Sequence, residues 1–203
     1  MTLLVLASTS TARQSLLAGA GLVFEALAAP LDEREIEAPL LAGGVSAAGI
    51  ARHLAEAKAL AVLALRPQAA VIGADQVLDL DGERMVKPGS RAAARRQIEQ
   101  LAGKTHRLVS AVAVARAGTI VWSHVSEARL TMRPLTAAAI ERYLDSAGEG
   151  IYGSVGAYHL EGVGVRLFEA VVGDYFTILG LPLLPLLGWL RHGGLIDGEE
   201  TET

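Results

Sequence analysis

The chain has 203 residues, of which 51% are hydrophobic, 20% are charged and none is cysteine. A chain of this size buries roughly 70% of the surface that its unfolded form exposes, so we expect one well-packed domain or two small lobes rather than a disordered chain. The lack of cysteine excludes disulfide scaffolds and cysteine-based metal sites. The net charge of −4 predicts no nucleic-acid partner, although a few local cations can still bind a small anion.

No stretch of the sequence predicts a membrane segment. The uncharged stretch Thr177–Leu190 contains Pro182 and Pro185 and is shorter than the ~20 residues of a spanning helix. Met1–Ser10 is apolar but has no basic residues before it, which is not typical of a secretion signal. We therefore expect a cytoplasmic protein without a membrane partner.

The first half of the chain predicts buried strands that alternate with capped helices. We expect strands at Leu3–Leu6, Val23–Leu27 and Ala70–Ala74, the last ending at Asp75. A helix at Ala12–Ala18 follows the hydroxyl cluster Ser8-Thr9-Ser10-Thr11, and a long helix covers Ser46–Arg66. Between these helices we expect a loop through Pro30, Asp32 and Glu33 and a break at Leu40–Gly44.

The second half begins with a hairpin signal at Asp81-Gly82. Helices are expected at Arg91–Leu101, Thr136–Ser146 and Leu183–Arg191, and strands at His106–Ala115, Thr119–Met132, Leu160–Ala170 and Tyr175–Leu179. Gly148–Gly156 is expected to be a loop. This order predicts an α/β fold with a mixed, partly antiparallel sheet and flanking helices, in one domain over residues 1–193 with a frayed polar tail at 194–203.

Several motifs match known binding sites in their residues but not in their surrounding predicted structure, so we reject them. Gly148, Gly150 and Gly153 have dinucleotide-binding spacing, but they follow a predicted helix and no helix opens after them. Lys104 lies in a Gly-Lys-Thr triplet that lacks the first glycine of a phosphate loop. The five histidines have no metal-ligand spacing, so we interpret them as surface or satisfied interior residues.

Polar residues follow the predicted strands at four places, each with an ordinary structural explanation. The hydroxyls of Ser8 and Ser10 with Arg13 are typical of an anion site at a helix start, or of a simple helix cap. Asp75 after an apolar strand is a candidate metal ligand or base, or a turn residue. The other two places are the Lys87-Pro88 segment, with Lys58 near the apolar edge of its helix, and the glycine-bearing loop 153–162 with Glu161.

In this order, these residues resemble the Maf family of nucleotide pyrophosphatases over almost the whole chain. The matching segments are Leu6–Ser10 with Arg13, Asp32-Glu33, Ala57-Lys58-Ala59, Gly73–Val77, Lys87-Pro88, Gly103–His106, Gly156–Tyr158, Glu161-Gly162, Gly173–Thr177 and Gly180–Leu183. The resemblance implies two lobes around a deep cleft, similar to inosine triphosphate pyrophosphatases. It also implies hydrolysis of a nucleoside triphosphate to the monophosphate and diphosphate.

The resemblance also implies roles for single residues. Asp75 and Glu33 match acidic positions that hold a magnesium or manganese ion, and Asp75 can activate water. Lys58 and Lys87 match catalytic cations that balance phosphate charge, whereas Ser8, Ser10 and Arg13 match substrate-binding positions that contact phosphate oxygens. A homodimer is implied by resemblance alone.

Two positions bear on the base. Gln76 and Glu161 resemble the subfamily that prefers 7-methyl-GTP, whereas members that prefer dTTP and UTP carry Thr and Gln there. A carboxylate at Glu161 can accept hydrogen bonds from the donor edge of a guanine. Members of that subfamily carry an aromatic residue that could stack on a methylated base at the position of Ala12, and alanine cannot stack in this way. A dTTP/UTP pyrophosphatase, a broad housekeeping enzyme and a non-catalytic regulator of septum formation and cell division remain the alternatives.

Overall fold

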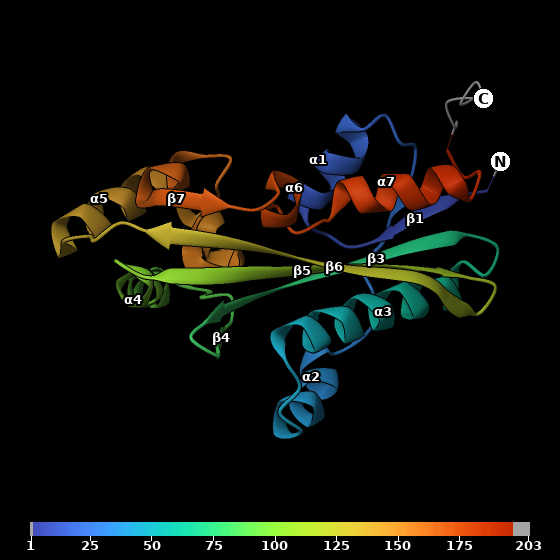
Figure 1. Cartoon of the computed structure of the whole chain (residues 1–203), viewed down its shortest axis with the longest axis horizontal. Helices are drawn as coiled ribbons and strands as arrows, with labels where there is room; N and C mark the ends of the chain where they lie inside the picture. The colour runs from blue at the N-terminus through green and yellow to red at the C-terminus, as the bar shows by residue number, and fades with distance from the viewer. Residues whose placement is uncertain (1, 197–203) are drawn as a thin grey trace.

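A seven-stranded mixed sheet runs the length of the molecule in the computed structural model, which describes residues 2–196 (Figure 1). The strand order is β2-β1-β3-β5-β6-β7, with β4 also paired to β3. The strands are β1 Leu4–Ala7, β2 Glu25–Ala26, β3 Ala70–Leu80, β4 Glu83–Met85, β5 Thr105–Arg116, β6 Thr119–Met132 and β7 Phe168–Val172. Because β1 pairs in parallel with β2 and β3 while the other pairs are antiparallel, the predicted fold class is confirmed.

Helices cover both faces of this sheet. They are α1 Thr11–Gly19, α2 Glu33–Ala42, α3 Ala47–Leu65, α4 Arg91–Leu101, α5 Ala137–Ala147, α6 Tyr175–Ile178 and α7 Leu183–His192. Figure 1 shows α1, α6 and α7 on one face, α3 with α2 beyond it on the other, and α4 and α5 at the far end. The predicted caps Ser10 and Ser46 are confirmed, since the side-chain oxygen of each accepts from a backbone N–H of the helix that follows, and Ser90 and Thr136 cap α4 and α5 in the same way.

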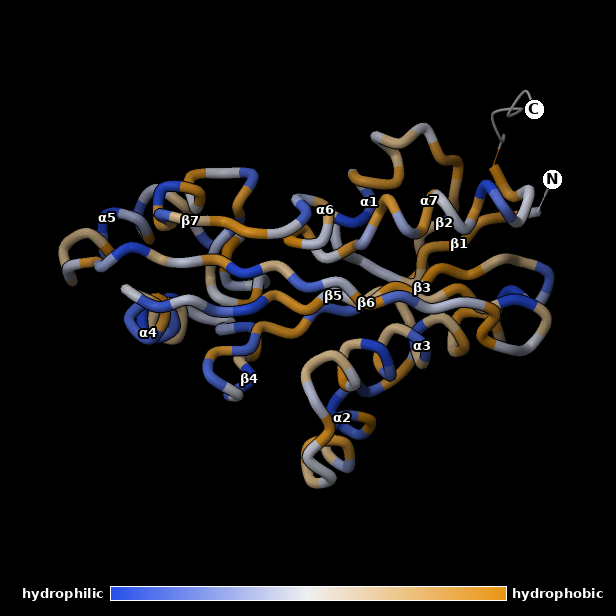
Figure 2. The backbone as a smooth tube through the Cα atoms, in the orientation of Figure 1, coloured by the Kyte–Doolittle hydropathy of each residue, from blue (hydrophilic) through white to orange (hydrophobic). Residues whose placement is uncertain are grey.

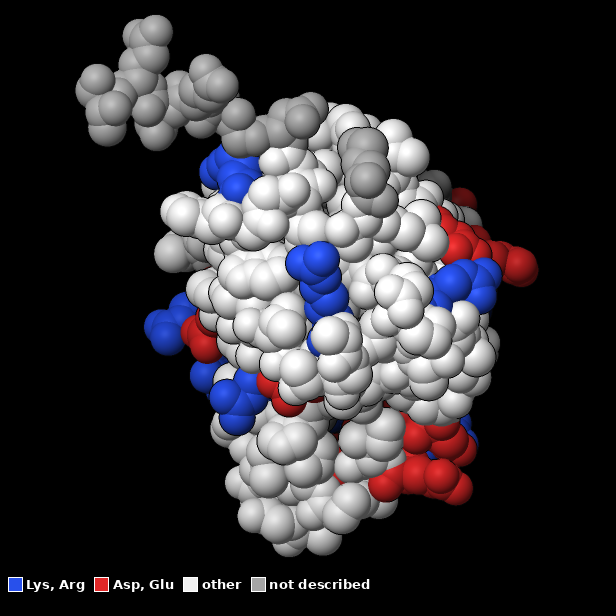
Figure 3. All heavy atoms as spheres, turned by 90° about the vertical axis from the view of Figure 1, so that its right-hand side faces the viewer, with Lys and Arg blue, Asp and Glu red and all other residues white. Residues whose placement is uncertain are grey.

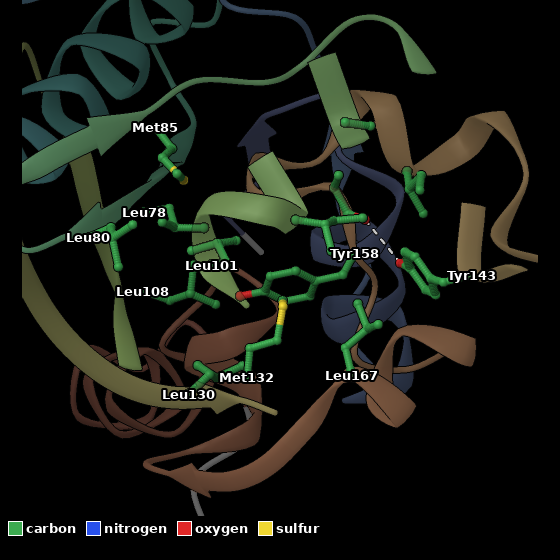
Figure 4. Close-up of a cluster of buried hydrophobic side chains, with 14 of the residues drawn as sticks. Leu78, Leu80, Met85, Leu101, Leu108, Leu130, Met132, Tyr143, Tyr158 and Leu167 are labelled. Carbon is green, nitrogen blue, oxygen red and sulfur yellow. Dashed lines mark hydrogen bonds between the residues drawn. The ribbon is translucent and has the colours of Figure 1, made fainter. Parts of the chain in front are cut away.

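The hydrophobic core is divided along the sheet. β3 and β5 are buried on both faces over most of their length and appear as apolar stretches in Figure 2. One cluster joins the end of β3 to α4 and α5, and the side chains of Leu101, Met132 and Tyr158 meet in it (Figure 4). Separate clusters cover the beginning of β3, one of them under α7 and another under α3. The core is therefore divided into clusters along one continuous sheet, and the expected two lobes around a cleft stay a prediction.

Three expectations for the first half were incomplete or wrong. β3 continues to Leu80 instead of stopping at residue 74, because β5 pairs with it as far as Asp79. The predicted second strand shrinks to Glu25–Ala26. The expected loop at Asp32 is followed by helix α2, since the Asp32 side chain accepts from the Arg34 N–H and caps the helix.

The last third of the chain also differs from the prediction. Tyr175–Leu179 was expected as a strand but forms α6, because the Asp174 carboxylate accepts from both the backbone N–H and the hydroxyl of Thr177. Val163–Leu167, the middle of an expected strand, is a 3₁₀ helix that precedes β7. The expected loop Gly148–Gly156 contains two further 3₁₀ turns.

The described part of the chain ends beyond the predicted domain boundary at residue 193. Leu195 is buried against the cluster under α7, and Ile196 packs on the same cluster. Residues 197–203 of the predicted tail lie outside those described. No helix in residues 2–196 combines the length and apolarity needed to cross a membrane. Basic and acidic side chains both occur on the end seen in Figure 3, so this part of the described surface presents no field of one sign.

Gly73 lets helix α3 lie unusually close to strand β3. A Cβ at this position would lie 2.1 Å from the Ala55 carbonyl oxygen and 2.8 Å from the Ala59 nitrogen, which are backbone atoms that cannot rotate away. We therefore expect Gly73→Ala to push α3 off the sheet and to lower the free energy of unfolding by ~1–3 kcal/mol or more, measured by urea denaturation.

The control for this prediction is Gly188→Ala in the interior of α7. No atom lies within 4 Å of a Cβ built at Gly188, so this change relieves a helix-interior glycine and is expected to be neutral or stabilising by up to ~1 kcal/mol. Equal stability of the two variants would contradict the close-approach argument.

Candidate active site

A gap in the pairing of strand β3 defines the candidate active site. On one edge β1 pairs with β3 only as far as Gly73, and on the same edge β4 starts to pair at Leu78. Residues 74–77 therefore have no strand partner there, while β5 pairs with their other edge. Ligands in α/β proteins bind where neighbouring strands end and diverge. Asp75 is thus inside β3 rather than after it, and the strand that ends beside it is β1.

A buried ammonium lies between two carboxylates at this gap. Lys58 Nζ, from α3, lies 2.5 Å from Asp75 Oδ1 and 2.8 Å from Glu33 Oε1. Lys58 and Asp75 are only 7% and 6% exposed, whereas the Glu33 side chain, in the first turn of α2, is half exposed. The arrangement satisfies the buried charges by pairing them, and it uses only one oxygen of each carboxylate.

Arg13 joins the same site from the opposite face of the sheet. Its Nε donates to the Gly180 carbonyl at 2.8 Å, and Nη1 donates to the Ala74 carbonyl at 2.9 Å, which uses the unpaired edge of β3. Burial lowers the pKa of Arg13, and the charges of Asp75 and Glu33 oppose that shift. Arginine stays protonated under such conditions, so Arg13 provides a fixed positive charge.

Lys87 completes the group of charges. It is exposed on the segment that leaves β4. Burial raises the pKa of Glu33, but the hydrogen bond and charge of Lys58, with the charges of Lys87 and Arg13, outweigh this effect and hold the pKa below its usual value. The structure therefore brings together four of the predicted site residues, Arg13, Glu33, Lys58 and Asp75, and the charge of Lys87 acts on Glu33.

The two serines are beside Arg13 at the end of β1. Ser8 is buried, and its hydroxyl oxygen accepts from Arg13 Nη1 at 3.3 Å and from the Ser10 N–H at 3.2 Å. Ser10 Oγ accepts from the Arg13 N–H as the cap of α1. The hydroxyl proton of Ser8 can therefore still be donated to an anion next to Arg13.

Gln76 faces the other side of β3 from Asp75 and is already engaged. Its Nε2 donates to Ser110 Oγ at 2.9 Å and to the carbonyls of Thr177 and Ile178 at 3.1 and 2.9 Å. Because both amide protons are used, the Oε1 atom is what Gln76 can offer to a ligand, and that atom is a hydrogen-bond acceptor.

Glu161 is not brought into contact with these residues. It is exposed in the tight turn His159–Gly162, which is closed by a hydrogen bond from the Gly162 N–H to the His159 carbonyl. Gly164 makes the following turn possible, since a Cβ there would lie 2.4 Å from the His159 oxygen. The proposed partnership of Gln76 and Glu161 in binding a base therefore stays a prediction.

Sequence analysis missed an ion pair next to the site. Glu37 is 6% exposed and binds Arg84 of β4 with two hydrogen bonds, one of them 2.8 Å between Arg84 Nη1 and Oε2. Desolvation raises the pKa of Glu37, Arg84 opposes this, and the charges of Asp75 and Glu33 add to the increase. The sequence could have indicated Glu37, because it lies four residues after Glu33. If Asp32 is recognised as a helix cap, this spacing places both glutamates on one helix face.

His106 is an interior residue with a structural contact. Its Nε2 is 2.7 Å from the Tyr158 hydroxyl, and burial lowers the pKa of His106 to about 4, so the ring is neutral. Burial raises the pKa of Tyr158. His106 is therefore an interior residue as predicted, but only one ring nitrogen is satisfied, since the buried Nδ1 has no hydrogen-bond partner among residues 2–196.

Two surface cavities lie elsewhere on the molecule. The larger, of about 600 Å³, is lined by residues of α4 and α5 that include Arg91 and Asp145, and the smaller, of about 360 Å³, lies beside Asp79 and Arg107. Asp75 lines neither of these two cavities.

Comparison with known proteins identifies the family. A family model described as Maf-like protein matches residues 3–193. The chain belongs to this family. It is 52% identical over 195 residues to a 7-methyl-GTP pyrophosphatase of Brucella abortus biovar 1 (strain 9-941), with 96% of this chain and 98% of the relative covered. It is 54% identical over 194 residues to a nucleoside triphosphate pyrophosphatase of Rhodopseudomonas palustris (strain ATCC BAA-98 / CGA009), with 95% of each covered.

The lowered pKa of Glu33 predicts how the stability of this Maf-like chain depends on pH. A carboxylate with a depressed folded-state pKa stabilises the fold above its unfolded value of 4.5, and this contribution is lost as pH falls through the folded pKa. We expect Glu33→Gln to lower the free energy of unfolding by less than ~1 kcal/mol at neutral pH, since Glu33 is half exposed.

The difference between wild type and Glu33→Gln should shrink as pH falls below 4.5, in urea titrations repeated along a pH series. Glu35→Gln, an exposed change of the same charge on the same helix, is the control and should give a smaller difference. A wild-type advantage that grows toward acid pH would contradict the ion-pair assignment.

Proposed function

We propose that the protein hydrolyses a nucleoside triphosphate between its α and β phosphates. Water attacks the α phosphorus, the bond from that phosphorus to the bridging oxygen breaks, and the products are a nucleoside monophosphate, diphosphate and a proton. The observation that carries the proposal is the convergence of the carboxylates of Asp75 and Glu33 with Lys58 and Arg13 at the unpaired edge of β3. The names of the relatives, which are pyrophosphatases, support it.

Each charged residue has a role in this proposal. Oδ1 of Asp75 is held by Lys58, so Oδ2 is the oxygen that accepts the proton of the attacking water. Arg13 and Lys87 offset the charge of the phosphates, including the charge that grows on the leaving diphosphate. Ser8 donates its hydroxyl proton to a phosphate oxygen beside Arg13.

The donor set suits a magnesium or manganese ion. Within residues 2–196 no three His, Asp or Glu side chains converge to hold a metal, so the protein offers the two carboxylates of Asp75 and Glu33. Hard cations such as magnesium are bound through one or two carboxylates, with substrate phosphate and water as the other ligands. When bound, the ion polarises the phosphoryl oxygens and offsets their charge.

We further propose that the base is of the guanine type, with 7-methyl-GTP preferred. The free Oε1 of Gln76 and the carboxylate of Glu161 are both acceptors, which suits the N1–H and amino donors of guanine. Thymine and uracil offer one donor between two acceptors. Ala12 provides no ring for stacking, so the preference rests on hydrogen bonding and on the acidic residue near a cationic base.

The proposal is tested by diphosphate release with magnesium from 7-methyl-GTP, GTP, dTTP, UTP and CTP. We expect 7-methyl-GTP to have the highest kcat/KM, and Asp75→Asn to lower it by ~100-fold or more because the general base is lost. Asp81→Asn in the hairpin turn is the control, since Asn tolerates the positive φ of that position. Release from none of the five nucleotides would show that the proposed function is wrong.

Glu161→Gln tests the choice of base separately. An amide both donates and accepts, so we expect the ratio of kcat/KM for UTP to that for 7-methyl-GTP to rise by about tenfold, the effect of roughly one exchanged hydrogen bond to a charged group. Glu169→Gln on β7 is the matched control, because Glu169 is also exposed. An unchanged ratio in Glu161→Gln would remove Glu161 from base recognition.

A further inference from the structure

Two segments that the proposed function assigns to opposite ends of the nucleotide meet at one side chain. The first is 86–89, which leaves β4 and carries Lys87, and the second is 154–162, which carries Glu161. Gln97, in the middle of α4, contacts both. Its Nε2 donates to the Val86 carbonyl, and its Oε1 accepts from the Gly156 N–H at 3.1 Å.

The chemistry of these two partners fixes the orientation of the Gln97 amide. The Val86 carbonyl can only accept and the Gly156 N–H can only donate, so the reversed amide would lose both hydrogen bonds. A side chain of another type and similar length, such as methionine, cannot make either bond. Gln97 is therefore a specific link between the two segments and not only a packing residue.

The 154–162 segment is firmly held, which makes it a fixed reference for Lys87. Gly156 has φ +79°, and a Cβ there would lie 2.7 Å from Leu78 Cδ1 of β3. Tyr143 donates to the Ala157 carbonyl at 3.0 Å, the dashed line in Figure 4, and the Tyr158 ring is buried in the cluster at this end of the sheet. Backbone and core together therefore set where Gly156 lies.

The 86–89 segment has fewer supports of its own. Pairing of β4 with β3 stops at Met85, and Val86 and Lys87 are exposed. Besides Gln97, the Gly89 N–H donates to the Tyr152 carbonyl at 3.1 Å, which again ties this segment to the same neighbourhood. Beyond Met85, the backbone contacts of the 86–89 segment are therefore made with α4 and the residues near the 154–162 segment.

We propose that Gln97 is a positioning residue that fixes Lys87, a phosphate-binding cation, relative to the loop that carries Glu161. Its amide makes binding of the triphosphate and recognition of the base depend on each other. This inference rests on the proposed function and deepens it, because Gln97 acts on selectivity through the two segments and touches no substrate itself.

The first test measures the link directly by NMR amide exchange at Gly156. Gln97→Met removes both bonds, and we expect exchange of the Gly156 N–H to speed up by about tenfold, in line with the loss of one hydrogen bond. Gln97→Glu keeps an acceptor for this N–H and should preserve its protection. Gln100→Met, exposed on the same helix, is the matched control and should also preserve it.

The second test is the ratio of kcat/KM for 7-methyl-GTP to that for UTP. We expect Gln97→Met to lower this ratio by about tenfold, mainly through KM, as two hydrogen bonds are lost, and Gln97→Glu to lie between it and wild type. Gln100→Met should match wild type. A structural role alone would lower both nucleotides equally and leave the ratio unchanged.

The outcomes separate the two proposals. If wild type releases diphosphate but Gln97→Met keeps both the ratio and the Gly156 protection, the inference about Gln97 is overturned while the function stands. An equal loss for both nucleotides, with a lower melting temperature, overturns it as well. If wild type releases diphosphate from neither nucleotide, the proposed function fails, and so does the selectivity role of Gln97 that rests on it.

Discussion

The ammonium of Lys58 between Asp75 and Glu33 is the interaction on which the rest of the site depends. A buried lysine and a buried aspartate are each costly to remove from water, and only their pairing makes both tolerable. The pairing requires α3 to lie against β3 at the distance that Gly73 allows, and α2 to begin where Asp32 caps it. The ion pairs of Lys58 therefore depend on the relative positions of α2, α3 and β3.

The same arrangement balances the charges of the site. Arg13 and Lys58 lie with Glu33 and Asp75, and the neighbouring pair of Glu37 and Arg84 is neutral in sum, so the charge of Lys87, which acts on Glu33, is added to a balanced group. The chain as a whole has a charge of −4. A net negative chain with cations gathered at one place favours a small anion over a long one such as a nucleic acid.

The sequence predicted the sheet and the capped helices well because those signals are local. Ser46, Ser90 and Thr136 begin helices where the sequence places them, and the β5–β6 hairpin turns where it was expected. It also named the charged residues that meet, through family resemblance. It missed α2, α6 and the true length of β3, since each depends on a non-local partner or on a cap that resembles a turn. The roles of Glu37 and Gln97 were missed because the sequence does not show which distant residues, Arg84 in one case and Val86 and Gly156 in the other, a polar side chain on a helix will bind.

The segment from Asp174 to Gly180 shows why the missed elements matter for chemistry. If this segment were a strand, its carbonyls would accept hydrogen bonds from a neighbouring strand. As α6 and the turn that follows, it offers the carbonyls of Thr177 and Ile178 to Gln76, and that of Gly180 to Arg13. The last part of the chain therefore orients two side chains from its first half, and the unpaired edge of β3 is bounded by residues far apart in sequence.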